Sequence, residues 1–255
     1  MRSAWRSDQG LVRENNEDAV AVDEANGIFL LADGMGGGPG GEVASDLAVT
    51  AAHHLLVEKF PGCDPDHIGR LLADALAAAH SAIARRALLE PSLDGMGTTL
   101  EIVVVRGNVA HICHVGDSRV YLFRQGSLRQ VTTDDNYAAV LAARGNIPAG
   151  QIPAAYRHVL TQALGVSEEL VPQLHTLGLE PGDLLLLCSD GLTEALADAE
   201  IGALMGGKPP DPALLADSLV AAANGKGGPD NVSVVVIDPI PPPPVGTLLL
   251  PSPPA

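Results

Sequence analysis

The feature that most limits the possible folds is three strand-like runs in close succession. They span Thr99–Arg106, Val109–Val115 and Val120–Arg124, and Gly107-Asn108 forms a two-residue turn between the first two. A parallel pair of strands needs a crossover connection of roughly a dozen or more residues, so runs this close pair antiparallel. The spacing predicts an antiparallel meander of three strands and argues against a series of βαβ units.

Further strand and helix signals flank this meander in blocks. Strand-like runs also lie at Ala19–Val22, Ile28–Ala32, Leu184–Cys188 and Val232–Ile237. Weaker helical patterns fit Tyr137–Arg144 and Pro212–Ala223. Hairpins mixed with long helices indicate the α+β class, in which helices cover the faces of sheets.

Two long helices carry the clearest periodicity. The pattern predicts one helix over Glu42–Phe60 and another over Ile68–Leu88. The apolar stripe of the first consists of Val43, Leu47, Ala51 and Leu55. The stripe of the second consists of Ile68, Leu71, Leu72, Ala75, Leu76, Ala79 and Ile83. We expect both stripes to pack against a sheet.

Charge and composition narrow the possible functions and partners. The 255 residues include 15 basic and 31 acidic ones, a net charge of −16, which argues against binding nucleic acid or an anionic membrane surface. The sequence shows no signal peptide, no Cys-x-x-Cys pair and no apolar run of the roughly 18 residues that a membrane span needs, so we expect a cytoplasmic location. We expect one folded domain over 1–238. The Pro-rich tail over 239–255 reads as a disordered end, with a docking segment for a partner as the alternative.

Acidic residues recur beside glycine or turn residues at the ends of the strand-like runs. They are Asp18, Asp33, Asp117, Asp190 and Asp230. Any one of them alone reads as a turn residue. Strands, however, deliver residues to a sheet edge, and adjacent glycines let the backbone approach an ion. If the carboxylates converge, two of them about 5 Å apart repel by roughly 3 kcal/mol at an effective dielectric near 20, so the group stays ionised only around cations.

A set made only of carboxylates favours Mg²⁺ or Mn²⁺ over zinc. Two such ions about 3.5–4 Å apart can ionise a water for in-line attack on a phosphoryl group. A cationic side chain is then needed to bind the phosphate oxygens, and Arg13 is the nearest candidate. The residues therefore support the hypothesis of a metal-dependent hydrolase of phosphate esters.

The same residues carry a family resemblance, which covers about residues 7–238. Its motifs are Arg13-x-x-Asn-x-Asp18, Asp33-Gly-Met-Gly-Gly37, Met96-Gly-Thr-Thr-Leu100, Gly116-Asp-Ser-Arg119, Ser189-Asp-Gly-Leu192 and Gly228-x-Asp-Asn231. In order and distance they resemble those of the metal-dependent serine/threonine protein phosphatases, the type 2C (PPM) family, in its compact bacterial form. The resemblance implies a four-layer α-β-β-α sandwich of two antiparallel sheets flanked by helices, with the metals at one end of the sheets.

The resemblance also implies roles for the metal-binding residues. Asp33 matches the carboxylate that bridges two Mg²⁺ or Mn²⁺ ions, and Gly34 would offer its backbone carbonyl. Asp190 and Asp230 would complete the two-metal centre. Asp117 matches the carboxylate of a third, weaker site that is shared with Asp190.

Other residues match supporting roles in the same family. Asp18, and with it Glu17, would hold metal-bound waters from the second shell. Arg13 matches the residue that grips the substrate phosphate, and Asn231 would orient Asp230 or a water. On this basis Arg13, Asp18 and Asp33 are the candidate catalytic residues.

The implied function is an Mg²⁺/Mn²⁺-dependent phosphoprotein phosphatase. A metal-bridging hydroxide would attack phosphoserine or phosphothreonine directly, with no phospho-enzyme intermediate. The implied partners are phosphorylated proteins, including a cytosolic Ser/Thr kinase or its targets, and we take a monomer as the default state.

Two departures from the family pattern keep other readings open. Gly38 stands where bacterial members usually have His, and Asp134-Asp135-Asn136 stands where Asp-His is common. One alternative is a catalytically weak or inactive regulator that binds phosphoproteins. Another is a metal-dependent hydrolase of small phosphoesters.

Several further residues receive structural interpretations. His111, Cys113 and His114 share one strand, where alternate residues face opposite ways, so we interpret them as packing residues. Arg119 is interpreted as a structural partner of a carboxylate, and Asp94 as a turn residue. By analogy with the family, residues 135–167 are expected to form a flap beside the site.

Overall fold

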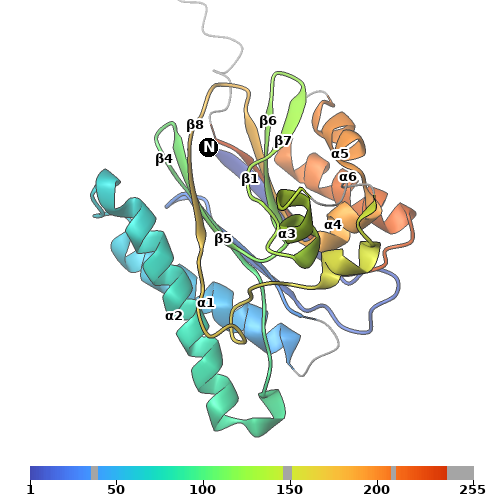
Figure 1. Cartoon of the computed structure of the whole chain (residues 1–255). Helices are drawn as coiled ribbons and strands as arrows, with labels where there is room; N and C mark the ends of the chain where they lie inside the picture. Colours follow the sequence, from blue (N-terminus) through green and yellow to red (C-terminus); the bar gives the residue numbers. More distant parts are fainter. Residues whose placement is uncertain (36–39, 146–150, 208–210, 240–255) are drawn as a thin grey trace, which may run out of the picture.

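The computed structural model describes residues 1–35, 40–145, 151–207 and 211–239. Gly38 and the Pro-rich tail beyond residue 239 therefore lie outside the described residues. Two antiparallel sheets of five strands each face one another, and helices cover their outer faces (Figure 1). This is the four-layer α+β sandwich that the resemblance implied.

The strands of each sheet come from distant parts of the chain. The first sheet has the order β1 (Arg2–Asp8), β10 (Val232–Asp238), β9 (Leu184–Cys188), β6 (Arg119–Arg124) and β7 (Ser127–Gln130). The second sheet has the order β2 (Asp18–Asp23), β3 (Ile28–Asp33), β4 (Leu100–Arg106), β5 (Val109–Val115) and β8 (Gln173–Gly178).

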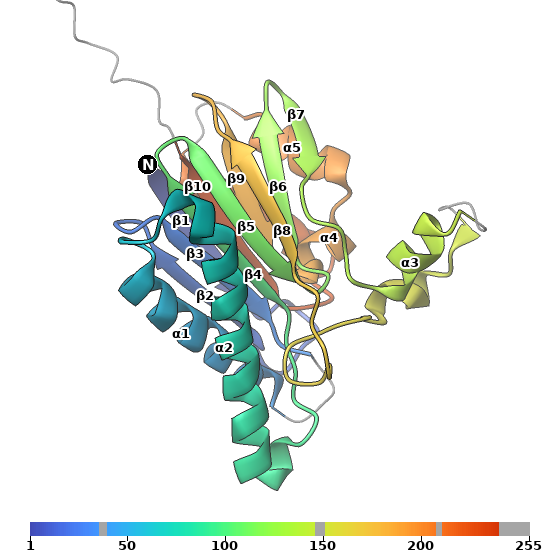
Figure 2. The same ribbon diagram turned by 60° about the vertical axis from the view of Figure 1, so that its left-hand side comes forward.

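The helices divide between the two outer faces. On the second sheet lie α1 (Gly41–Lys59) and α2 (Ile68–Leu89), and on the first lie α4 (Asp190–Ala195), α5 (Asp198–Met205) and α6 (Pro212–Gly225). Figure 2 shows α3 (Tyr137–Ala143) and the 3₁₀ turn Ala154–His158 projecting to one side of the sandwich. Within the described part of the chain, no helix is long and apolar enough to cross a membrane.

Three apolar cores hold the layers together. One lies between the sheets and includes Phe29, Val103 and Leu187; the other two lie between each sheet and its helices. Because side chains alternate along a strand, β3 contributes Leu30 to the helix side and Leu31 to the space between the sheets. Such strands are buried on both faces and read as continuous apolar runs, which is why the sequence revealed them.

The predicted meander is wrong in its third strand. β4 and β5 pair as expected, but β6 leaves the second sheet and pairs with β7 and β9 in the first. The chain changes sheet at Gly116, whose φ of +120° belongs to the left-handed region. A Cβ at this position would lie 2.5 Å from the Thr99 side chain, so the link fits only glycine.

The helix predictions are confirmed in their positions, and one stripe is corrected. All seven residues of the predicted α2 stripe are buried. In α1 the buried residues include Ala44, Ala48, Ala52 and Leu56, and the predicted stripe of Val43, Leu47, Ala51 and Leu55 flanks them half-buried. Small alanines face the sheet there because the helix packs closely on it, and the larger side chains fill the margins.

Candidate metal centre

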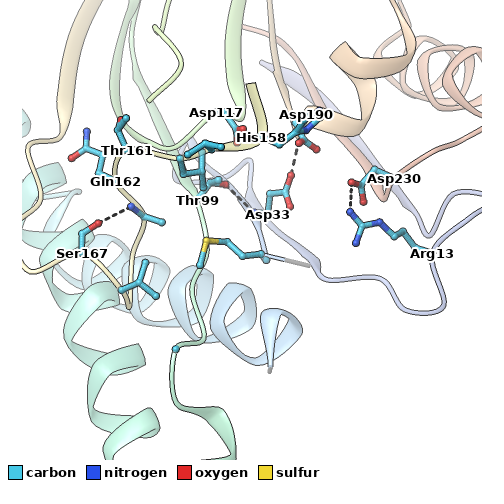
Figure 3. A pocket seen from close by; sticks show the side chains of 17 residues that line it. Arg13, Asp33, Thr99, Asp117, His158, Thr161, Gln162, Ser167, Asp190 and Asp230 are labelled. Carbon is cyan, nitrogen blue, oxygen red and sulfur yellow. Dashed lines mark hydrogen bonds and ion pairs between the residues drawn. The ribbon is translucent and has the colours of Figure 1, made fainter. Parts of the chain in front are cut away.

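The five acidic residues come together at one end of both sheets, and Figure 3 shows four of them, Asp33, Asp117, Asp190 and Asp230. Asp33 is the last residue of β3, and Asp18, the first of β2, lies directly opposite it in the antiparallel register. Asp117 follows β5, Asp190 begins α4 just after β9, and Asp230 precedes β10. The predicted convergence is therefore present, although the strands that deliver the acids belong to two different sheets.

Four of these acids line one cavity of about 650 Å³, together with Arg13 and Gly34. They are Asp33, Asp117, Asp190 and Asp230. The opposite wall is formed by His158 to Ala163, Val166 and Ser167, which lie in the stretch expected to be a flap. A second cavity of about 260 Å³ adjoins the first, because Asp117, Asp190 and His158 line both.

Desolvation and mutual repulsion make these carboxylates hard to ionise. Burial raises the pKa of Asp18 to about 6 and that of Asp117 to about 7. Burial and the neighbouring charges of Asp18 and Asp190 raise the pKa of Asp33 well above its ordinary value. Burial, followed by Asp117 and Glu194, does the same to Asp190.

The protein itself provides few hydrogen-bond donors to this group. The Asp190 backbone N–H lies 3.4 Å from Asp33 Oδ2, a long contact, and Ser189 Oγ donates to Asp18 Oδ2 at 2.8 Å. Asp18 Oδ1 is buried and has no hydrogen-bond partner among the described residues. An unpartnered buried carboxylate oxygen is costly unless a water or a cation completes it.

The residues present fit hard divalent cations. All the side-chain atoms that the acidic cluster offers to a metal are carboxylate oxygens, and such ligands suit Mg²⁺ or Mn²⁺ rather than zinc. Gly34 is also shaped by close packing, since a Cβ there would lie 2.3 Å from the Gly41 carbonyl oxygen and 2.6 Å from that of Glu17. Any larger residue would displace the backbone that carries Asp33.

Arg13 enters the cavity from the loop between β1 and β2. Its Nη2 atom lies 2.5 Å from Asp230 Oδ2, and its side chain is partly exposed. Figure 3 shows Arg13 beside Asp230, on the side of the cavity away from the Thr161–Gln162 wall. A guanidinium in this position can bind an anion that also faces the acidic cluster.

Asn231 contacts Asp230 through its backbone and the loop before β2 through its side chain. Its side chain accepts a hydrogen bond from the Glu17 backbone N–H at 2.9 Å and donates to the carbonyl oxygens of Gln9 and Asn15. It therefore fixes the loop that carries Arg13 and Glu17. Asp230 is oriented by the Asn231 backbone N–H, which donates to Asp230 Oδ1 at 2.7 Å.

Glu17 is positioned through its backbone. Its carbonyl oxygen accepts from the Gly34 N–H at 3.0 Å, and burial raises the pKa of its carboxyl. This contact joins the loop before β2 to the turn after β3. Glu17 therefore lies beside the acidic cluster.

His158 and Glu194 were not among the predicted site residues. Their ligand atoms and those of Asp190 lie within 4.8 Å of one another, and His158 Nδ1 is 2.8 Å from Glu194 Oε1. His158 is an exposed residue at the end of the 3₁₀ turn Ala154–His158, a stretch in which the sequence periodicity predicted no element. Glu194 lies four residues after Asp190 on α4, and this helical spacing was the only available signal.

The structural interpretations of other residues are largely confirmed. Arg119 binds Asp134 through two hydrogen bonds of 2.8 and 2.7 Å. Cys113 and His114 are fully buried, whereas His111 is half-buried. Asp94 is exposed in a turn, although Gly95 next to it lines the cavity.

These features together define a class of protein. The chain is an α-β-β-α sandwich that gathers carboxylates from both sheets beside an arginine at one end. The sequence model of the protein phosphatase 2C family matches residues 12–207, and the chain belongs to this family.

Relatives of known name agree with this assignment. The chain is 42% identical over 238 residues to the serine/threonine protein phosphatase PstP of Mycobacterium tuberculosis, covering 93% of this chain but only 45% of that protein. It is 32% identical to the serine/threonine phosphatase stp of Listeria innocua, covering 93% of this chain and 96% of that one. The chain thus spans less than half of PstP and nearly all of stp.

Solved structures show the same architecture. The crystal structure of the PstP catalytic domain in complex with two manganese ions superposes with a TM-score of 0.81 at 42% sequence identity. The alignment covers 93% of this chain and 97% of that domain.

Proposed function

We propose that the chain is an Mn²⁺- or Mg²⁺-dependent phosphatase of phosphoserine and phosphothreonine in proteins. The observation that carries this proposal is the cavity in which Asp33, Asp117, Asp190 and Asp230 face Arg13. The names of the family members, and the two manganese ions in the related PstP catalytic domain, support it.

We assign the cation ligands to residues that the fold brings to one end of the sheets. Asp33, the Gly34 carbonyl, Asp190 and Asp230 would hold two ions, and Asp117 with Asp190 would hold a third, weaker one. Bound there, the cations would supply positive charge that lowers the pKa of a water and neutralises phosphate oxygens, which is the chemistry of direct attack by a hydroxide with no phospho-enzyme.

The other side chains act on the substrate and on water. Arg13 would bind two phosphate oxygens through its guanidinium fork, and its bond to Asp230 holds it at the cavity edge. Asp18 Oδ1, buried without a partner among the described residues, would accept a hydrogen bond from a water in the cluster. The wall from Val159 to Ser167 would exclude bulk water and contact the peptide around the phosphorylated residue.

We also propose a cytoplasmic location, a monomeric state and one catalytic domain over 1–238. The proposed substrates include a Ser/Thr kinase or its targets. The net charge of −16 favours substrates that carry basic residues near the phosphate, because acidic peptides would be repelled.

Turnover of a phosphothreonine peptide and of p-nitrophenyl phosphate, each with millimolar Mn²⁺ or with EDTA, tests the function. We expect hydrolysis of both with Mn²⁺ and none with EDTA. Binding of the phosphopeptide without turnover would favour the inactive regulator. Good turnover of a small metabolite beside poor turnover of the peptide would favour the small-phosphoester hydrolase.

A further inference from the structure

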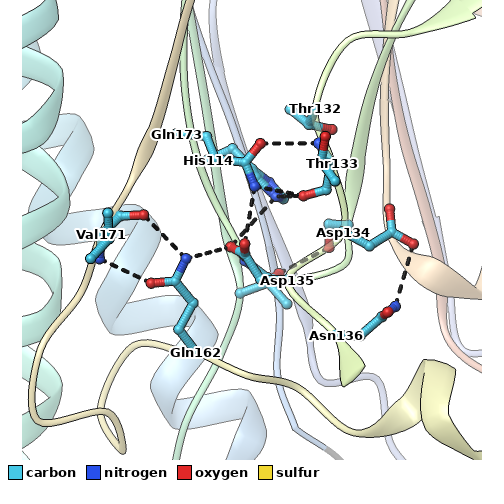
Figure 4. A network of polar contacts seen from close by, with 12 residues as sticks. His114, Thr132, Thr133, Asp134, Asp135, Asn136, Gln162, Val171 and Gln173 are labelled. Carbon is cyan, nitrogen blue, oxygen red and sulfur yellow. Dashed lines mark hydrogen bonds and ion pairs between the residues drawn. The ribbon is translucent and has the colours of Figure 1, made fainter. Parts of the chain in front are cut away.

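Asp135 is bonded both to Gly116, the residue before Asp117, and to Gln162 in the wall of the cavity, and Figure 4 shows it beside Gln162. It stands where the chain leaves the first sheet and enters α3, and it is partly buried. Its carboxylate accepts three hydrogen bonds from three separate segments, and its backbone makes two more. Arg119, which also approaches this stretch, is bound to Asp134 instead.

One set of bonds fixes the turn at Gly116. The Gly116 backbone N–H donates to Asp135 Oδ2 at 3.1 Å, and the Asp135 backbone N–H donates to the Gly116 carbonyl at 2.6 Å. Gly116 is the residue at which the chain changes sheet, and Asp117 follows it directly into the cavity. These reciprocal bonds hold the backbone of the turn from which Asp117 enters the cavity.

A second set of bonds fixes the cavity wall. Gln162 Nε2 donates to the same Asp135 Oδ2 atom at 2.8 Å, and the Thr161 backbone N–H donates to the Asp135 carbonyl at 2.7 Å. Thr161 and Gln162 both line the cavity. At the next position a bridge between Asn136 and Leu160 joins the two ends of the projecting segment.

The surroundings require a carboxylate at this position. Oδ2 faces two donors, and Oδ1 accepts from Gln173 Nε2 at 3.0 Å, so an amide in place of the carboxylate would turn a donor toward another donor. His114 Nε2 lies 3.7 Å from Oδ2, and the His114 ring is itself held by Glu101 at 2.5 Å in the space between the sheets.

We propose that Asp135 is a positioning residue that sets the Asp117 carboxylate and the Thr161–Gln162 wall together. This inference rests on the proposed phosphatase function and deepens it. One carboxylate thereby couples the acidic end of the cavity to the wall that contacts the substrate. The positions of these two parts of the cavity therefore depend on each other.

The variant Asp135→Asn tests this coupling, with Gln173→Ala as the matched control. The control removes the bond to Oδ1, together with the Gln173 bonds to the Thr133 backbone, and leaves the carboxylate and both bonds to Oδ2 in place. D135N instead turns an NH₂ group toward at least one of the three donors, and this donor–donor contact displaces the side chain. We expect D135N to lower kcat/KM for a phosphothreonine peptide about tenfold or more and to raise the Mn²⁺ concentration for half-maximal activity, because small displacements at a reacting centre cost roughly 10²-fold. Q173A should stay within about threefold of the wild type on the same scale. Equal losses in the two variants, or no loss in D135N, would overturn the proposal.

A double-mutant cycle separates positioning from general stability. If Asp135 acts through Asp117, adding D135N to Asp117→Asn should lower kcat/KM by only about twofold more, whereas independent effects multiply. The full D135N loss reappearing in the D117N background would contradict the inference. Should D135N fail to fold, Gln162→Ala replaces it in the same cycle, and multiplicative losses would again count against coupling.

Calorimetric titration with Mn²⁺ keeps the inference separate from the function. D135N should weaken the Mn²⁺ binding that D117N removes, whether or not the protein turns over phosphopeptide. If the wild type shows no Mn²⁺-dependent turnover, the proposed function is wrong and the positioning role is unaffected. If Mn²⁺ titration of D135N equals that of the wild type, the positioning role is wrong and the proposed function is unaffected.

Discussion

The charge of Asp33 is opposed by four other carboxylates, those of Asp18, Asp117, Asp190 and Asp230. Repulsion between two carboxylates about 5 Å apart amounts to roughly 3 kcal/mol at an effective dielectric near 20. The charge of Asp33 therefore lowers the stability of the metal-free chain, and it serves the function only when cations are bound. Asp33 therefore offers a test in which stability and function move in opposite directions.

We predict that Asp33→Asn stabilises the metal-free chain and abolishes its activity. At pH 8 in EDTA the unfolding free energy should rise by about 1–3 kcal/mol, because one buried negative charge is removed. Mn²⁺-dependent turnover should fall more than about 100-fold, since even residues behind a metal ligand contribute 10–100-fold. Chemical denaturation and the phosphopeptide assay measure these two effects.

The matched control for D33N is Asp94→Asn, in the second Asp-Gly-Met-Gly sequence of the chain. Asp94 is exposed, so its substitution should change neither quantity. Activity retained in D33N, or a metal-free D33N less stable than the wild type, would contradict the assigned role of Asp33.

Arg13 should act on substrate binding more than on the chemical step. Arg13→Ala is expected to raise KM for phosphopeptide about tenfold, which corresponds to the loss of one charged hydrogen-bonded contact. Arg13→Lys keeps the charge without the fork, so it should recover only part of the loss. Steady-state kinetics separate KM from kcat, and an unchanged KM in R13A would remove Arg13 from the phosphate site.

Among the strands and helices, the link between β5 and β6 decides where Asp117 lies in the site. The two strands belong to different sheets, and the link at Gly116 brings Asp117 to the end shared by both. The left-handed φ of Gly116 and the 2.5 Å approach to Thr99 leave no room for a side chain.

We predict that Gly116→Ala lowers both stability and activity. Backbone strain and overpacking each cost about 1–3 kcal/mol, so the unfolding free energy should fall by that order. Gly107→Ala is the control, because its Cβ meets nothing within 4 Å although its φ is also positive. If G116A loses no more stability than G107A and keeps full activity, the crossing does not need glycine.

How far the sequence predicted these elements depended on burial. Strands β3, β4, β5, β9 and β10 are buried on both faces, so continuous apolar runs marked them. β1, β7 and β8 were missed because they lie at the edges of the sheets and mix exposed with half-buried residues. β6 follows β5 at the spacing of a hairpin, so no sequence signal indicated that the two strands belong to different sheets.

The candidate site was more predictable than the topology. Asp33, Asp117, Asp190 and Asp230 each follow or precede a buried strand, and short motifs identified all of them. The bonds from the Asn231 side chain to the backbone of Gln9 and Asn15 could not be predicted, because these groups are close only after folding. His158 reaches the site from the end of a short 3₁₀ turn, which no local sequence pattern placed beside the acidic cluster.

Across the whole molecule, the acidic cluster makes metal-free stability depend on pH. The pKa values of Asp18 and Asp117 rise from 3.8 to about 6 and about 7 on folding, chiefly through burial. Between pH 4 and pH 7 the folded chain therefore binds more protons than the unfolded chain, and stability falls as pH rises through that window.

We expect the melting temperature in EDTA to be higher at pH 5.5 than at pH 8, and excess Mn²⁺ to reverse this order. Cations replace the protons that the cluster needs, so they should stabilise the chain most where the carboxylates are ionised. Thermal unfolding at both pH values, with and without Mn²⁺, measures the effect. A melting temperature in EDTA that rises with pH over this range would contradict the account.

Carboxylates from two sheets meet at one end of the molecule, and we infer that they hold divalent cations there. A crystal soaked in Mn²⁺ tests this inference, because anomalous scattering locates the ions without reference to the protein atoms. We expect two ions within coordination distance of Asp33, Asp190 and Asp230. Crystals soaked in millimolar Mn²⁺ with no ion beside these three carboxylates would contradict it.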